Sequence, residues 1–399
     1  MTARTSNRLI SLVIISVLLT SLLQSKAANP SKETQEKQWV VYKGKAGPGK
    51  GKRVVLISGD EEYRSEETLT QLAKLLSIHH GFSCTVLFPL DPDTGIINPY
   101  NLENIPGLDA LKEADLMVVF IRFRNLPDQQ MRQIDDYLKT GKPVLGMRTS
   151  THAFRLPLGR KDWLHYDYRY NSPTNWVHYD GRYNGEKKEW ARGFGGLILG
   201  DTWFYHYGYH NNQSTRGLVA PEARGLPITR GLSDGAIWGP TDVYAVRQPL
   251  PKDTLPIIMG QTINRKNPRD DKDIFLGMRP TDDEVASTGQ NPTADRGQDR
   301  YNPNDPMMPV AWTKSYQVPG GKKGKVFATT MGAATDLMSE GTRRMLVNAV
   351  YWCVGLEKKI PAEGTKVDLI QPYNPTPFRF QSDDYWKKKG LRPGDFQLE

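Results

Sequence analysis

Short apolar runs alternate with amphipathic segments between positions 53 and 147. Two of these segments, 65–79 and 128–138, carry apolar residues at helical spacing, and a glycine follows each of them closely. The apolar runs are typical of buried strands, and they cover 53–58, 82–88, 116–121 and 143–147. Continuous apolar strands alternating with amphipathic helices indicate a parallel sheet that is covered on both faces. With right-handed crossovers, the pattern predicts an α/β protein with a doubly wound, mostly parallel, flavodoxin-like sheet.

The pattern loses this regularity beyond position 155. An aromatic segment, 163–210, and a polar segment, 262–307, are expected to form long loop excursions. A further helix is predicted at 339–354 from its apolar face. Further short strands are predicted at 197–199, 256–259, 310–313 and 325–330.

The N-terminus has the three-part layout of a secretory signal peptide. Arg4 and Arg8 precede an apolar run, 9–23, and Ser25 and Ala27 are the small residues of a cleavage site. A membrane anchor is the alternative, but the run has 15 residues, and a helix needs about 20 to span a bilayer. We therefore expect a periplasmic or secreted protein with no stable membrane anchor after cleavage.

The expected organisation is one folded domain with short additions. A signal peptide at 1–27 and a polar linker at 28–52 precede a domain at 53–358, and a Pro-rich tail at 359–399 is expected to pack on it. The chain has 399 residues and a formal charge of +9, and loss of 1–27 reduces that charge to +6. The excess of basic residues is not concentrated in one stretch but is interspersed with acidic residues, so a nucleic-acid partner is not expected. Two cysteines exclude a disulfide-rich scaffold and a four-cysteine zinc site.

Charged and hydroxyl side chains follow the predicted strands where the strands end. In an open α/β sheet, ligands bind beyond the carboxyl ends of the strands, so these side chains are the first candidates for a site. Taken singly, each is better explained as a solvated loop charge or a helix cap, but the group predicts a site. In chain order the candidates are Asp60, Glu61, Arg122, Arg124, Arg148, Thr149 and His152.

The stretch 142–148 resembles the nucleophile turn of class I glutamine amidotransferases, in which a cysteine sits on a tight turn after a strand. Arg148 stands at that place, and an arginine cannot act as the nucleophile. Cys84 and Cys353 cannot replace it, because one is predicted inside the second strand and the other inside the last helix. We therefore expect no cysteine-dependent amidotransferase activity. The two thiols are expected to be buried and separate, with a disulfide between them as the alternative.

Six segments together make the chain resemble the ThuA-like (trehalose-utilisation) family. The resemblance runs from about residue 53 to residue 361, and it implies an amidotransferase-like fold without the catalytic cysteine. It also implies a role in the metabolism of sugars, especially oxidised (keto) disaccharides. The segments are KPVLGMRTSTHAF (142–154), FGGLILGD (194–201), PTDVYAV (240–246), PVAWTKSY (309–316), GKVFATTMG (324–332) and RRMLVNAVYWCVG (343–355).

The chain departs from this family at residues that carry chemistry in relatives. Family members commonly have histidine where this chain has Arg148 and Ala333, and those histidines are candidate metal or catalytic groups there. His152 lies four residues beyond Arg148 and is a candidate replacement. The Asp-Glu-x-Tyr motif of the family corresponds here to 241–244, which adds Asp242 and Tyr244 to the candidate residues.

The aromatic segment 163–210 holds 14 aromatic residues in 48 positions. Aromatic faces beside polar side chains suit a sugar, and Trp203 and Tyr205 are the candidates for stacking on one. A loop region packed by its own aromatic residues is an equally good interpretation. His206 and His210 are four residues apart, a spacing that can bind zinc on a helix, although Gly208 and the nearby tyrosines disfavour a helix there. Contacts to a sugar and a structural role are the alternatives, and no cofactor is assigned. Because the pair follows a candidate strand that leads to the same edge as Arg148, we expect Trp203, Tyr205, His206 or His210 to approach His152 and Asp242 closely enough to share one small ligand.

Two functions remain open from the sequence. The first is an exported enzyme that acts on a small carbohydrate, with His152, Asp60, Glu61 and Asp242 as acid–base candidates. In it, Arg122 and Arg148 hold the substrate or stabilise developing negative charge. The second is a non-catalytic carbohydrate-binding or structural module that has kept the fold and lost the catalytic histidines.

Overall fold

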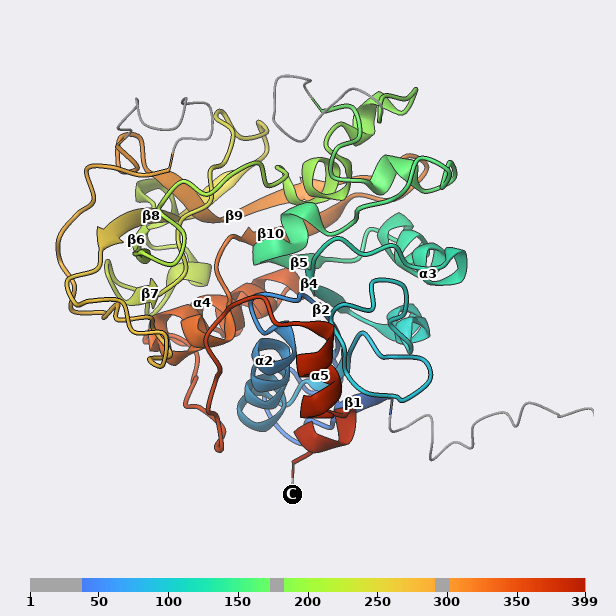
Figure 1. Ribbon diagram of the computed structural model, residues 1–399, viewed down its shortest axis with the longest axis horizontal. Coiled ribbons are helices and arrows are strands. Elements are labelled where there is room, and N and C mark those ends of the chain that lie inside the picture. The colour runs from blue at the N-terminus through green and yellow to red at the C-terminus, as the bar shows by residue number, and fades with distance from the viewer. Residues whose placement is uncertain (1–37, 173–182, 291–301, 399) are drawn as a thin grey trace, which may run out of the picture.

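The computed structural model describes residues 38–172, 183–290 and 302–398, and within these ranges ten strands form one sheet (Figure 1). Its spatial order is β1-β3-β2-β4-β5-β10-β9-β8-β6-β7. The strands are β1 Trp39–Tyr42, β2 Arg53–Gly59, β3 Ser83–Leu87, β4 Leu116–Ile121, β5 Val144–Met147, β6 Gln213–Val219, β7 Ile237–Gly239, β8 Leu255–Asn264, β9 Met308–Tyr316 and β10 Gly324–Thr329.

The centre of the sheet is parallel and its outer parts are antiparallel. β3, β2, β4, β5 and β10 pair in parallel, with Val55 opposite both Thr85 and Met117. β9, β8, β6 and β7 continue the sheet in antiparallel pairs on one side, and β1 closes the other side against β3. The expected α/β class with a mostly parallel core is confirmed. Because parallel strands share a direction, their carboxyl ends meet at one edge of the sheet.

Three of the predicted helices are present with nearly the expected bounds: α2 Ser65–His80, α3 Asp128–Lys139 and α4 Glu340–Cys353. α2 begins with two acidic residues in its first turn, where the helix dipole favours negative charge. It ends at Gly81, whose left-handed φ of 79° lets its N–H bond to the carbonyls of Leu76 and Ser77. α2 and α4 contact each other and the parallel strands.

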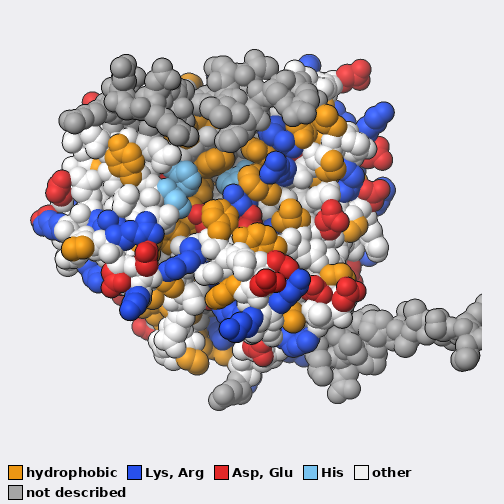
Figure 2. All heavy atoms as spheres, viewed as in Figure 1, with side chains coloured by type: hydrophobic (Ala, Val, Ile, Leu, Met, Phe, Trp, Pro, Cys, Tyr) orange, Lys and Arg blue, Asp and Glu red, His pale blue; other side chains and the backbone are white. Residues whose placement is uncertain are grey.

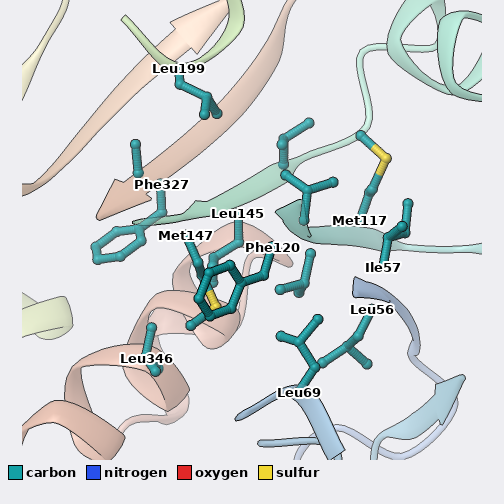
Figure 3. Packing of buried hydrophobic residues seen from close by; sticks show 14 of the residues in the cluster. Leu56, Ile57, Leu69, Met117, Phe120, Leu145, Met147, Leu199, Phe327 and Leu346 are labelled. Carbon is teal, nitrogen blue, oxygen red and sulfur yellow. The ribbon is translucent and has the colours of Figure 1, made fainter. Parts of the chain in front are cut away.

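Hydrophobic side chains fill the core on both sides of the parallel strands (Figure 3). Leu69 of α2 and Leu346 of α4 pack on one side, and Leu199 packs on the other. Gly146 in β5 allows this approach, because a Cβ there would lie 2.6 Å from a methyl carbon of Leu199. The glycine in the predicted strand 143–147 is therefore needed so that Leu199 can pack directly on the sheet.

The expected strand at 197–199 is wrong. These residues form a π-helical turn, η5 Gly195–Leu199, whose last residue packs on Gly146. A short apolar run has the same appearance in a buried strand and in a buried helical turn, so its periodicity could not separate the two. The two glycines that begin the turn also bring its backbone close to that of Thr151 and Ala191.

The expected linker at 28–52 is also partly wrong. Trp39–Tyr42 forms β1, and Gly44 and Gly47 lie directly against the backbone of His80 and Gly81 at the end of α2. Burial alternates along this strand, with Val40 and Tyr42 buried and Val41 exposed, which is the pattern of a strand with one covered face. This part of the segment therefore belongs to the domain.

The C-terminal segment 359–398 crosses the domain and contains one α-helix, α5 Asp383–Lys389, and a short 3-10 helix, Pro393–Phe396. The buried ring of Trp386 lies under the guanidinium of Arg64 at 4.6 Å. The backbone of Arg379 pairs with the carbonyl of Glu62, and the carbonyl of Phe396 accepts a hydrogen bond from Tyr42. The segment thus reaches both the carboxyl ends of the strands and the β1 edge.

The expected signal peptide at 1–27 and the start of the expected linker lie outside the described residues. Among the residues that are described, no helix has the length and apolar character needed to cross a membrane. Cys84 and Cys353 are both free and buried, as expected.

Candidate functional site

The turns that follow three parallel strands have left-handed backbone at a non-glycine residue. Arg64 after β2, Phe123 after β4 and Arg148 after β5 have φ values of 59°, 52° and 41°. Such conformations cost on the order of 1–3 kcal/mol each and persist only where the surrounding structure fixes them. Arg148 begins a tight turn, η2 Arg148–His152, at the place of the amidotransferase nucleophile. The strained turns gather at the edge where the sequence predicted a site.

The strand-tip cluster consists of Asp60, Glu61, Arg122, Arg124 and Thr149. The Asp60 carboxylate accepts a hydrogen bond from Thr149 Oγ1 at 2.6 Å, and its other oxygen accepts backbone N–H groups of the turn after β2. Glu61 pairs with Arg122 through one oxygen and with Arg124 through the other, the latter at 3.4 Å. The strand-tip candidates are thus brought together, but mainly as partners of one another.

Burial dominates the electrostatics of the strand-tip cluster. It raises the pKa of Asp60 and of Glu61, an effect that the nearby Arg122 opposes in both cases. It also lowers the pKa of Arg124 to about 10. Arg124 donates to backbone carbonyls of residues 99, 101 and 122 and is completely buried, so its predicted role in substrate binding is not supported. It joins the strand tips to the neighbouring loop instead.

Arg148 is also completely buried and makes four hydrogen bonds. Its Nη1 donates to the carbonyls of Asp242 and Thr330 at 2.8 and 2.7 Å. Its Nη2 donates to Asp242 Oδ1 at 3.0 Å and to the Tyr63 hydroxyl at 3.1 Å. The guanidinium lies over the Tyr244 ring at 3.8 Å. Arg148 therefore orders the floor of the site from within, where the sequence had placed it in contact with a substrate.

The histidine cluster consists of His206, His210, Asp242 and Glu62. His206 Nδ1 lies 2.8 Å from Asp242 Oδ2, and His210 Nδ1 lies 2.9 Å from Asp242 Oδ1. The other nitrogen of His210, Nε2, lies 3.0 Å from Glu62 Oε1. The two histidine side chains are 21% and 23% exposed, whereas the carboxylates are 0% and 7% exposed. The two partly exposed imidazoles are thus held in place by contacts with buried carboxylates.

Mutual contacts set the charges of the histidine cluster. Burial alone would raise the pKa of Asp242, but His206 and Arg148 hold the pKa of this carboxyl well below its usual range. Burial likewise opposes the charged form of His210, yet hydrogen bonds to Asp242 and Glu62 raise its pKa to about 9. In the protein alone, His210 is therefore an imidazolium between two carboxylates at neutral pH.

Aromatic rings from four parts of the chain surround the histidine cluster. Trp203 lies 5.7 Å from His206 between ring centroids, and Phe378 of the C-terminal segment lies 5.8 Å from His210. Tyr63 stacks on Phe378, and Tyr244 meets His206 edge to face. Figure 2 shows histidine side chains at the surface of this face among hydrophobic and acidic side chains. Imidazole nitrogens and aromatic faces thus occur together at an accessible place.

His152 lies behind this surface and is buried. Its ring centroid is 5.1 Å from those of both Phe123 and Trp203, and Tyr168 completes the aromatic surroundings. Burial, with the positive charge of Arg122, lowers the pKa of His152 well below its usual value, so the imidazole is neutral. Its position agrees with the predicted shared site, but its burial argues against direct proton exchange with solvent.

Most aromatic residues of the segment 163–210 form a packed layer. Trp163, Tyr166 and Trp190 are buried against one another, and Phe194 is buried beside Phe154. Tyr205 packs against Phe204 and Tyr207. Trp203, the other stacking candidate, lies against His152 and His206. Trp176 and Tyr179 lie outside the described residues.

Sequence reasoning missed three residues of the site: Glu62, Tyr63 and Phe378. The first two belong to the same turn as Asp60, so their position after a predicted strand could have indicated them. The sequence does not show, however, which carboxylate of this turn faces the histidines. Phe378 comes from a segment with no strand or helix pattern near it, and the sequence carries no sign of its position. Conversely, the expected approach of His206 and His210 to Asp242 is confirmed.

Comparison with known proteins gives similarity at the level of structure only. No protein-family model and no curated protein matches the chain. Two crystal structures of proteins named from their likeness to ThuA are similar to it. One, from Parabacteroides merdae ATCC 43184, is 12% identical, with 84% of this chain and 99% of the other covered at a TM-score of 0.38. The other, from Bacteroides uniformis ATCC 8492, is 14% identical, with 80% and 97% covered at a TM-score of 0.39. The chain is thus similar to structures that bear the name of the family its motifs resemble, and at these values the similarity carries no argument about the reaction.

Proposed function

We propose that the protein is an exported ThuA-like protein that acts on a sugar or sugar derivative, such as an oxidised (keto) disaccharide, without amidotransferase chemistry. The observation that carries this proposal is the histidine cluster, in which two partly exposed imidazoles stand on a buried carboxylate beside Trp203. Imidazole nitrogens match the hydroxyl and carbonyl oxygens of a sugar, and an indole face matches its C–H surface.

The scaffold supports a ligand at this place. We infer a doubly wound, flavodoxin-like arrangement of the central sheet, because β3-β2-β4-β5-β10 corresponds to the order 2-1-3-4-5 of such folds. Ligands of these sheets bind beyond the carboxyl ends of the strands, which is where Glu62 and Arg148 stand. In the proposed complex, His206 and His210 contact the ligand, and Asp242, which Arg148 fixes in place, holds both imidazoles from behind.

One observation favours a non-catalytic carbohydrate-binding module as the second candidate. Three of the predicted acid–base residues, Asp60, Glu61 and Asp242, are buried with both carboxylate oxygens already bonded to protein groups. A carboxylate that works as a general base has to reach its substrate. The two candidates differ in whether a bound sugar is converted, so one experiment separates them.

Sugar binding and turnover test the proposal. Calorimetry with a disaccharide and its keto derivative measures binding, and mass spectrometry of the mixture detects a product. His206→Ala is expected to weaken binding at least tenfold, because it removes a partly exposed hydrogen-bonding group. His79→Ala is the matched control, since this histidine of α2 bonds to the carbonyl of Asp368, far along the chain from the cluster. Binding without conversion supports the module; equal binding by wild type and His206→Ala contradicts the site.

The proposed export rests on residues 1–27, with their basic start, apolar run and small residues. The mature protein is expected to begin near Ala28 and to be found in the periplasm or medium. Mass spectrometry of the protein isolated from its native host measures the N-terminus directly. A chain that keeps Arg4 in that sample contradicts export by this signal.

A further inference from the structure

We propose that the histidine cluster is a binding site for one first-row divalent transition-metal ion, with zinc as the probe. The ligands are one nitrogen each of His206 and His210 and an oxygen of Asp242, whose ligand atoms all lie within 4.8 Å of one another. Glu62 is the outer partner that orients His210. This inference concerns the same site as the proposed function, but it does not depend on the ligand being a sugar.

The spacing of the ligand atoms fits such an ion. Zinc binds imidazole nitrogen and carboxylate oxygen at about 2.0–2.2 Å, so neighbouring ligands around a tetrahedral ion lie about 3.3–3.6 Å apart. His206 Nδ1 and His210 Nδ1 lie 2.8 and 2.9 Å from the two oxygens of Asp242. A small outward shift of either partly exposed imidazole gives coordination distances. The buried carboxylate of Asp242 is already fixed by Arg148, so it need not move.

The Nδ1 position of His210 suits either a second proton or a metal ion. A neutral imidazole carries one N–H, and both nitrogens of His210 face carboxylate oxygens. If Glu62 accepts the Nε2–H, the lone pair of Nδ1 points at an oxygen of Asp242, and this contact is repulsive without a cation between them. The arrangement Glu62–His210–cation is the carboxylate–histidine–metal pattern that orients ligands in metal sites.

The donor set selects the class of metal. Imidazole nitrogens favour zinc, iron, copper and nickel, whereas calcium and magnesium require mostly oxygen ligands. Arg148 at 3.0 Å from Asp242 offsets part of the negative charge, which further disfavours hard cations that depend on carboxylates. Two partly exposed imidazoles and one buried carboxylate would leave a coordination position on the solvent side for water or for an oxygen of a substrate, as in catalytic zinc sites.

A proton on His210 is the competing cation, and metal titration of the full-length mature protein decides between the two. After treatment with a chelator and its removal, calorimetry with ZnCl2 and the visible spectrum with CoCl2 measure binding in the absence of sugar. We expect one ion per chain. His206→Ala and His210→Ala should each weaken zinc binding at least 100-fold. Glu62→Gln should weaken it 10- to 100-fold, as losses of such outer partners do.

His79→Ala is the control and should bind zinc like the wild type, and circular dichroism of every variant verifies that it is folded. No binding by the wild type, or equal binding by wild type and His210→Ala, overturns the metal site. Zinc binding without any sugar binding contradicts only the proposed function. Sugar binding by a chain that takes up no metal contradicts only the inference made here. The two failures are therefore distinguishable.

Discussion

The strand-tip cluster and the histidine cluster both contain charged side chains at the same edge of the sheet, but they differ in which of these side chains are accessible. In the strand-tip cluster, Arg122 is 18% exposed, whereas its partner Glu61 is 8% exposed and Arg124, which also bonds to Glu61, is 0% exposed. In the histidine cluster, the imidazoles are about one-fifth exposed over a carboxylate that is fully buried. Residue type and position at a strand end therefore indicate where a site is, but not which side chains a ligand can touch.

The origin of the residues explains the difference. The strand-tip cluster is formed by turns that follow β2, β4 and β5 directly, so its side chains are close to backbone groups and to one another. His206 and Asp242 instead come from longer connections of the antiparallel part, before β6 and after β7. Those connections bring side chains over the strand ends from outside. The inner cluster supports the turns, and the outer cluster is available to a ligand.

The largest expected effect is a loss of stability from Glu61→Ala. The change removes the partner of the completely buried Arg124, and breaking a buried ion pair costs about 3–5 kcal/mol of unfolding free energy. Urea unfolding measures it. Glu113→Ala is the control, since Glu113 and its partner Arg53 are both well exposed and such pairs contribute about 0–1 kcal/mol. Equal losses in the two variants would remove the distinction between a buried and an accessible cluster.

A smaller loss is expected from the double variant Cys84→Ala, Cys353→Ala, which probes thiols outside both clusters. Burial raises the pKa of each thiol to about 12, so neither forms a thiolate at neutral pH. We expect a loss of about 2 kcal/mol in stability from reduced packing, unchanged sugar binding and no glutaminase activity in either protein. Glutaminase activity that disappears in the double variant would place the chemistry outside the two clusters.

The pH dependence of the unfolding free energy should show that His152 stays neutral in the folded protein. Its pKa is depressed in the folded protein, so only the unfolded chain takes up the proton as pH falls below about 6.5. The contribution to the unfolding free energy is therefore lost toward acid pH, by about 1.4 kcal/mol per pH unit. Urea unfolding of wild type and His152→Phe between pH 6.5 and 5 measures the difference in slope. Parallel slopes would mean that this imidazole is charged in the folded protein and open to solvent.

The smallest expected effect on stability belongs to His206→Ala, about 1 kcal/mol or less. Its side chain is 21% exposed, and Asp242 keeps its bonds to Arg148 and His210 when the imidazole is removed. Thermal unfolding measures this loss. The difference between the losses of unfolding free energy in His206→Ala and Glu61→Ala then compares the two clusters directly. A loss as large as that of Glu61→Ala would assign His206 to the support of the fold.

The central strands and helices could be predicted from sequence because each is set by local pattern. The run 53–58 is apolar at its four central positions and the run 116–121 is apolar throughout, since both faces of the sheet are covered there, and they became β2 and β4. The run 197–199 has the same composition and became a turn of helix, because Gly146 opened a space for Leu199. That contact joins residues more than fifty positions apart, and no local pattern records it.

The sequence predicted where the candidate site lies, but only some of the residues that form it. Strand order placed Asp60 and Arg148 at one edge, and the spacing of His206 and His210 drew attention to the pair. Their joint contact with Asp242 was expected and is observed. The aromatic excess, by contrast, serves mainly to pack the loops, because large rings fill interior space wherever they occur. The exposure of a side chain determines whether a ligand can reach it, and this exposure depends on all the residues that surround it in the folded protein.

The course of the C-terminal segment has a consequence for how the protein folds. The ring of Phe378 lies against His210 and Tyr63, which precede it by more than 160 and 300 positions. Contacts of such long sequence separation form late, because the loops that they close are entropically costly. We therefore expect the wall of the site to be completed after the sheet has assembled around β10 and α4. Ligand affinity then serves as a measure of complete folding, since an intermediate with a formed sheet and an undocked C-terminal segment would lack it.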